Sequence, residues 1–213
     1  MTRIKPVAGE YYHVFNRGVE KRKIFLDTVD YERFFVYLKE FNCQDPIYSL
    51  YRAKQQAVEV KPLRKKKIVE IISYCLNPNH FHLILKQVSE NGISEFMKRL
   101  GVGYTGYFNS KNKRSGVLFQ GSYKSVRIRN NDHLLYLSAY VNDNHFIHGY
   151  SDKKDAIWKY SSLLEYLDKK NRNLCSKGVL LEQFRNKNNF FDFVKENSQF
   201  MKDKKEYEKY LIE

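Results

Sequence analysis

The chain has 213 residues and a formal net charge of +14 at pH 7, from 38 Lys and Arg against 24 Asp and Glu. Hydrophobic residues make up 42% and aromatic residues 15% of it, which excludes a disordered polypeptide and is enough for a full domain with its own core. No apolar run reaches about 18 residues and the first residues lack a signal-peptide pattern, so we expect a cytoplasmic protein without membrane helices. The three cysteines are odd in number and lack CxxC spacing, which argues against a disulfide framework or a cysteine-based zinc site.

The spacing of apolar residues predicts strands and helices in turn along the first half of the chain. These elements are a strand over 11–16, a helix from Asp27 or Thr28 to Phe41, a short strand or loop over 47–51, and strands over 68–76 and 81–85. Asn77-Pro78-Asn79 separates the last two strands and favours a tight turn between them.

The second half is predicted to be mostly helical. Its elements are a helix after Ser89-Glu90-Asn91, extended segments over 117–120 and 123–129, a helix from Asn131 or Asp132 to Gly149, and helical patterns over 163–167, 179–184 and 190–194. Gly101 and Gly103 leave open whether the first of these helices is continuous. Together the elements predict an α+β fold with helices packed on an antiparallel sheet. We divide the chain into a main domain over 1–150 and a basic helical extension over 151–213 packed on it.

Two histidines stand side by side at the start of the strand that follows the turn. Because side chains alternate along a strand, His80 and His82 share one face, about 7 Å apart by strand rise. Two imidazoles at this separation can reach one metal ion or one phosphate. The alternative is a pair of ordinary surface or half-buried histidines. We expect the imidazole of His82 to be exposed and dispensable for folding.

Tyr140 and Asn144 lie four residues apart in the third predicted helix and therefore project from the same face. If that helix packs across the strand face of the histidines, His80, His82 and Asn144 can converge on one ion. Two neutral imidazoles and an amide oxygen leave positions for water and phosphate oxygens, which suits Mg²⁺ or Mn²⁺. A nearby tyrosine hydroxyl can attack a phosphate ester, and the phosphotyrosine bond keeps the energy needed to rejoin a strand. The alternative is that Tyr140 is one of 17 tyrosines and only packs its helix.

The excess of positive charge indicates a polyanionic partner that is contacted mainly through its phosphates. The abundant aromatic residues suit single strands, whose unpaired bases stack on exposed rings, although we expect most of these rings to be core. Phosphate contacts position a nucleic acid and do not reveal its target sequence. The candidate contacts are Arg17, Lys21, Arg22, Lys23, Arg64, Lys65, Lys66, Lys67, Lys113, Arg114, Lys124, Arg127 and Arg129.

Five segments resemble, in the same order, motifs of the single-tyrosine transposases that carry a His-hydrophobic-His (HUH) motif. The resemblance is specifically to the REP-associated tyrosine transposases and their insertion-sequence relatives. The HUH segment is the run Asn-Pro-Asn-His-Phe-His-Leu-Ile-Leu at 77–85, and the other segments are 12–18, 116–125, 140–145 and 158–162. Each motif alone is weak evidence for the resemblance, whereas the five motifs in the same order are strong evidence.

This resemblance implies a ferredoxin-like antiparallel sheet with helices packed on it, of the HUH nuclease type, in residues 1–150. It implies metal ligands at His80, His82 and Asn144, a nucleophile at Tyr140, and Mg²⁺ or Mn²⁺ as the cofactor. The family usually has Pro after that Asn, whereas this chain has His145, as a bystander or an extra phosphate contact.

The implied activity is that of a transposase that nicks and joins DNA. It would cleave single-stranded DNA near hairpins, link Tyr140 to the 5′ phosphate and release a 3′ hydroxyl, working as a monomer or a homodimer. The alternatives are a non-catalytic or domesticated DNA- or RNA-binding protein, and an HUH nickase that initiates replication. The complete set of site residues argues against the first alternative. The short chain and the Trp-Ser-Ser-like segment at 158–162 argue against the second.

Overall fold

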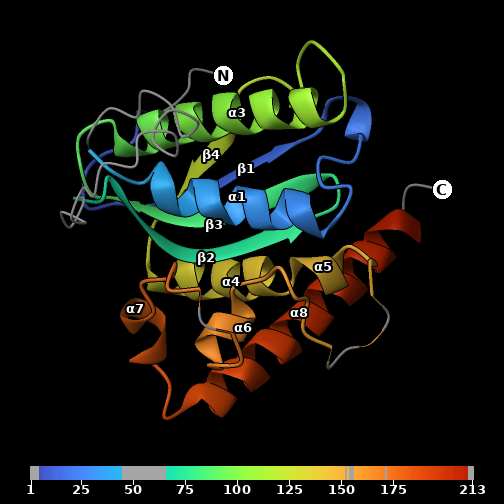
Figure 1. Ribbon diagram of the computed structural model, residues 1–213. Helices are drawn as coiled ribbons and strands as arrows, with labels where there is room; N and C mark the ends of the chain where they lie inside the picture. Colours follow the sequence, from blue (N-terminus) through green and yellow to red (C-terminus); the bar gives the residue numbers. More distant parts are fainter. Residues whose placement is uncertain (1–4, 45–65, 152, 154–155, 171, 211–213) are drawn as a thin grey trace.

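The computed structural model describes residues 5–44, 66–151, 153, 156–170 and 172–210 (Figure 1). Its strands are β1 (Tyr11–Arg17), β2 (Val69–Asn77), β3 (His80–Gln87) and β4 (Lys124–Arg127). They form one sheet in the order β2-β3-β1-β4, and every neighbouring pair is antiparallel. Helix α1 (Thr28–Glu40) joins β1 to β2, and α3 (Gly92–Lys111) joins β3 to β4. This chain order and strand order give the predicted α+β fold of ferredoxin-like type.

The predicted strands on both sides of the Asn-Pro-Asn turn correspond to β2 and β3. The segment 117–120, predicted to be extended, makes only an isolated bridge between Gly18 and Phe119. Gly121, with φ +69°, turns the chain there, and β1 pairs with β4 after the turn. The predicted strand or loop over 47–51 lies outside the described residues.

Helices α1 and α3 cover one face of the sheet (Figure 1). Their apolar side chains form a core in which Phe34, Phe81 and Phe96 are at most 2% exposed. Helix α3 is continuous through Gly101 and Gly103, the two glycines that left its continuity open. At Gly103 a Cβ atom would lie 2.6 Å from the ring of Phe41, which follows α1, so a larger residue there would have to displace that buried ring.

The C-terminal helices lie on the other side of the sheet (Figure 1). These are α4 (Asn131–Asn142), α5 (Asn144–Ile147), α6 (Leu163–Tyr166), α7 (Gly178–Leu181) and α8 (Lys187–Tyr210). A second core cluster joins Ile84 of β3 to Val141 of α4 and Val194 of α8. The division of the chain at residue 150 stays a prediction. No described helix is both long and apolar enough to cross a membrane.

The single helix predicted from Asn131 or Asp132 to Gly149 is wrong in two respects. Its cap is Asn130, whose side chain accepts a hydrogen bond of 2.9 Å from the backbone N–H of His133. The helix also breaks at Asp143, where φ is −118° and ψ is 22°, so that α4 and α5 are separate. The carboxylate of Asp143 is buried and held by α8, a contact that the local sequence does not reveal.

Lys195 of α8 and Asp143, at the break between α4 and α5, form a buried ion pair. Lys195 Nζ lies 3.0 Å from both carboxylate oxygens, and the two side chains are 5% and 2% exposed. Ser198 Oγ donates a further hydrogen bond of 2.7 Å to the same carboxylate. Removing one partner leaves the other charge buried without compensation.

We therefore expect Lys195→Met to lower the free energy of unfolding by about 3–5 kcal/mol. The matched control is Lys204→Met on the exposed side of the same helix, which should change it by less than about 0.5 kcal/mol. Urea unfolding followed by circular dichroism measures both. Equal stability of the two variants would contradict a structural role for the pair.

Candidate active site

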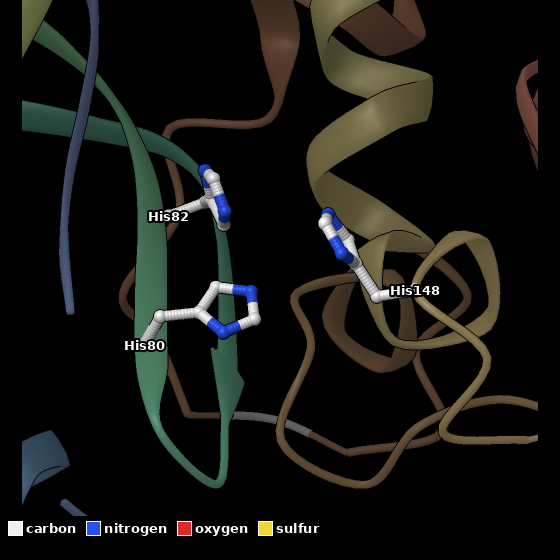
Figure 2. Close-up of side chains that lie close together, drawn as sticks. All are labelled: His80, His82 and His148. Carbon is white, nitrogen blue, oxygen red and sulfur yellow. The ribbon is translucent and has the colours of Figure 1, made fainter. Parts of the chain in front are cut away.

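Strand β3 carries two histidines on the face that α4 and α5 cover. His80 and His82 alternate with Phe81, which packs in the core under α1 and α3. Ile84 continues the histidine face and packs in the second core cluster. The ring centroids of the two histidines are 5.1 Å apart, and both rings project from β3 toward His148 (Figure 2).

The imidazole of His82 is buried, not exposed as expected. The residue is 7% exposed because the rings of His13 and Phe15 on neighbouring β1 lie against it, at centroid distances of 5.1 and 5.5 Å. His13 Nε2 lies 2.8 Å from His82 Nδ1, so the two nitrogens share one hydrogen. When His82 donates that hydrogen, its Nε2 keeps a lone pair for a ligand.

Asn77, at the end of β2, orients the groups around His80. Its Nδ2 donates to Asn144 Oδ1 at 2.7 Å and to His80 Nε2 at 3.0 Å. Its Oδ1 accepts from Nδ1 of His145 at 3.0 Å. His145 is 8% exposed and stacks on Trp158 at 3.7 Å, with 2° between the ring planes. It is therefore part of the support of the site and is not an exposed phosphate contact.

His80 presents an acceptor nitrogen to Asn144. Its Nδ1 lies 2.6 Å from Asn79 Oδ1, which can only accept, so Nδ1 carries the hydrogen and Nε2 the lone pair. Nε2 in turn lies 3.1 Å from Asn144 Oδ1, which is also an acceptor. Neighbouring oxygen or nitrogen ligands at ~2.1 Å from an octahedral Mg²⁺ are about 3 Å apart. Together with Nε2 of His82, this donor set fits a divalent cation.

Tyr140, in the last turn of α4, lies beside the ring of His82. Its ring meets that of His82 edge to face at a centroid distance of 5.5 Å. Burial raises the pKa of its hydroxyl above the ordinary 10, and the side chain of Asn144 opposes part of that rise. The break at Asp143 places Tyr140 and Asn144 on different helices, yet both remain beside the histidine pair.

His148 is a further histidine of the site. It ends α5, and nitrogen atoms of His80, His82 and His148 all lie within 4.8 Å of one another (Figure 2). Its Nε2 lies 3.3 Å from the Tyr140 hydroxyl, and its Nδ1 lies 2.8 Å from Lys205 Nζ. Burial and the Lys205 ammonium lower the pKa of His148 to about 4, so its imidazole is neutral at pH 7.

The sequence interpretation missed His148 and Lys205. A weak signal existed for His148, because it follows Asn144 at helical spacing. Lys205 gives no local signal, because it lies on α8, 57 residues after the histidine that it contacts.

The site opens into a pocket of about 470 Å³. Residues from both strands and helices line it, namely Phe15, Asn16, Arg17, Lys21, Asn79, His80, His82, Gln120, Lys124, Tyr140, His148 and Tyr150. Asn144 is fully buried and does not line the pocket. It contacts the site through its Oδ1, which lies 3.1 Å from Nε2 of His80. Three basic side chains thus border the groups that could act on a phosphate.

The other described residues that were predicted to contact DNA do not line this pocket. Lys23, Lys66, Lys67, Lys113 and Arg129 are exposed. The remaining described ones are engaged within the chain: Arg22 pairs with Glu20, Arg127 with Glu10, and Arg114 donates to Val117. Arg64 and Lys65 lie outside the described residues.

Buried neutral histidines make stability depend on pH. Burial lowers the pKa of His13 and of His145 from 6.5 to about 4. Below pH 6.5 the unfolded chain therefore binds more protons than the folded chain, and the free energy of unfolding falls as the pH decreases toward 4. At pH 5 the loss is roughly 2 kcal/mol for each of the two.

Urea unfolding at pH 7 and pH 5 tests this expectation. His145→Phe keeps a ring against Trp158 and removes one titrating group, so its stability should fall less between the two pH values. A wild-type protein equally stable at pH 7 and pH 5 would contradict neutral burial of these rings.

The chain matches one protein family and is similar to solved structures. The family model of IS200-like transposases matches residues 7–144, well over half of the chain. Among solved structures, the chain is similar to a REP-associated tyrosine transposase bound to a REP hairpin, with 16% identity, a TM-score of 0.49, and 82% of this chain and 88% of that chain covered. It is also similar to a candidate transposase from Deinococcus radiodurans, with 16% identity, a TM-score of 0.38, and 63% and 91% covered. No curated protein matches it. On the extent of the family match, this chain belongs to the IS200-like transposases.

Proposed function

We propose that the protein cleaves and rejoins single-stranded DNA through a covalent 5′-phosphotyrosine at Tyr140. His80, His82 and Asn144 would hold a Mg²⁺ or Mn²⁺ ion beside it. The observation that carries the proposal is the Tyr140 ring, which lies 5.5 Å from that of His82 in a pocket that Arg17, Lys21 and Lys124 border.

The proposed role of each side chain in the reaction follows from its contacts. When bound, the cation would polarise the scissile phosphate and offset the charge that develops on it. Asn79 holds His80 in the tautomer whose Nε2 is an acceptor, and His13 holds His82 in the same tautomer when it accepts the hydrogen of His82 Nδ1. Basic side chains at the pocket edge hold flanking phosphates, and Tyr140 supplies the attacking oxygen.

The cleavage step balances without ATP. Tyr140 Oη attacks phosphorus, the Oη–P bond forms and the P–O3′ bond breaks. The phenol proton passes to water, and the 3′ oxygen takes a proton from water. Rejoining is the reverse, with a 3′ hydroxyl as the nucleophile and the tyrosine oxygen as the leaving group.

The DNA is proposed to carry a hairpin near the cleaved bond. Support for this part comes from the five motifs that resemble REP-associated tyrosine transposases. The basic pocket edge accounts for contact with a phosphate backbone and does not select its sequence.

The test is incubation of the protein with Mn²⁺ and a single-stranded oligonucleotide that contains a hairpin with flanking strands. The proposal predicts a protein–DNA adduct that survives a denaturing gel, together with a fragment that ends in a 3′ hydroxyl. The fully duplex oligonucleotide and a chelator-treated sample are the controls. Binding of the hairpin without any adduct would leave the non-catalytic DNA-binding alternative.

A further inference from the structure

His148 has two possible roles that exclude each other. It could complete the metal site with His80 and His82, or it could serve the oxygen of Tyr140. We infer that His148 is not a metal ligand and instead donates a hydrogen bond to the Tyr140 oxygen, in a tautomer that Lys205 of α8 enforces. This inference rests on the proposed function for its catalytic consequence, but not for its geometry.

The tautomer follows from the partner of Nδ1. A lysine ammonium has three donors and no acceptor, so Nδ1 of His148, 2.8 Å from Lys205 Nζ, must accept. A neutral imidazole with an accepting Nδ1 carries its hydrogen on Nε2. That Nε2 lies 3.3 Å from the Tyr140 hydroxyl oxygen, which therefore receives the hydrogen bond.

The contrast with His80 separates a ligand from a donor. In His80 the second nitrogen, Nδ1, faces the side-chain oxygen Oδ1 of Asn79, the arrangement that leaves the lone pair of the ring on Nε2, as a metal ligand requires. In His148 the second nitrogen faces a cation, which opposes that arrangement and would also repel a metal ion through the ring. The residues that contact the second ring nitrogen thus give His80 and His148 different roles, one as a metal ligand and the other as a hydrogen-bond donor.

Helix α8 is tied to α5 at both ends of that short helix. Lys195 pairs with Asp143 just before α5, and Lys205 contacts His148 at its end. The backbone N–H of His148 donates to Asn144 O at 3.0 Å, which fixes its position relative to the proposed ligand. The family match ends at Asn144, so this arrangement lies beyond the matched residues.

The chemical consequence concerns the charge on the tyrosine oxygen. During rejoining, the 3′ oxygen attacks phosphorus, its proton passes to water, and the P–Oη bond breaks with the electron pair on Oη. The Nε2–H of His148 points at that phenolate oxygen as the charge develops. In cleavage it stabilises the same oxygen as a nucleophile. His148 is then a catalytic residue and Lys205 a positioning residue.

The first test needs neither DNA nor activity. In metal-free protein with ¹⁵N-labelled histidine, NMR should show His148 with hydrogen on Nε2, and Lys205→Met should shift part of the population to the Nδ1–H form. Mn²⁺ affinity measured by calorimetry should stay within twofold in His148→Ala and be lost in His80→Ala. A tenfold or greater loss in a folded His148→Ala, or a wild-type Nδ1–H tautomer, would overturn the inference.

The second test measures rejoining from the preformed adduct after a 3′-hydroxyl strand is added. Loss of one donor to a developing oxyanion predicts a slowing of about 100-fold for His148→Ala. His148→Gln, which keeps an N–H donor, should recover at least tenfold of that loss, and Lys204→Met should match the wild type. Wild-type rejoining by His148→Ala would refute the catalytic role.

The two ideas fail in different ways. A wild-type protein that never forms an adduct would refute the proposed function, and the NMR and Mn²⁺ results would still decide the role of His148. A normal wild-type adduct with Mn²⁺ affinity lost in His148→Ala would refute only the inference.

Discussion

Replacing Tyr140 with phenylalanine is expected to abolish the covalent adduct and to slow DNA cleavage by about 10⁴-fold or more, because the change removes the attacking oxygen and little else. Binding of a hairpin oligonucleotide should be nearly unchanged, because the basic side chains at the pocket edge remain. The free energy of unfolding should change by less than about 1.5 kcal/mol, the worth of one hydrogen bond. Adduct formation on denaturing gels and a binding titration measure the two effects separately.

Tyr136→Phe is the matched control. Tyr136 lies one turn earlier on α4, is 44% exposed and is not among the residues that line the pocket. The variant should cleave like the wild type. An adduct of wild-type yield in Tyr140→Phe would place the nucleophile elsewhere.

Replacing His82 with alanine is expected to reduce Mn²⁺- or Mg²⁺-dependent cleavage by at least about 10³-fold, because it removes a proposed ligand. Because His82 is buried, its replacement should also lower the stability of the folded protein. Its loss leaves His13 Nε2 without its partner in a buried position, which costs about 1–3 kcal/mol. Cleavage kinetics and thermal unfolding should both be recorded.

His80→Ala gives the same test with less effect on folding, because His80 is only partly buried. His133→Ala is the control, since His133 is not among the residues of the pocket. Cleavage that persists in both ligand variants, or in the presence of a chelator, would refute the metal site.

Local chemistry made much of the fold predictable. The Asn-Pro-Asn turn between two apolar runs dictated β2 and β3, and strand alternation placed His80 and His82 on one face. The continuity of helix α3 could not be predicted from the sequence. The ring that packs against Gly103 belongs to Phe41, on another part of the chain.

The parts that could not be predicted depend on contacts distant in sequence. The buried carboxylate of Asp143, at the break between α4 and α5, is held by Lys195 and Ser198, which lie 52 and 55 residues later. The burial of His82 depends on two rings of β1, which its own strand does not reveal. The tautomer of His148 depends on Lys205 in the same way. A sequence window around each residue contains none of these partners.

The most direct measurement is mass spectrometry of the protein–DNA adduct after digestion with protease and nuclease. A nucleotide joined through its 5′ phosphate to the peptide that contains Tyr140, and to no other tyrosine, is the expected result. A nucleotide on a different residue, or an adduct joined through a 3′ phosphate, would contradict the mechanism.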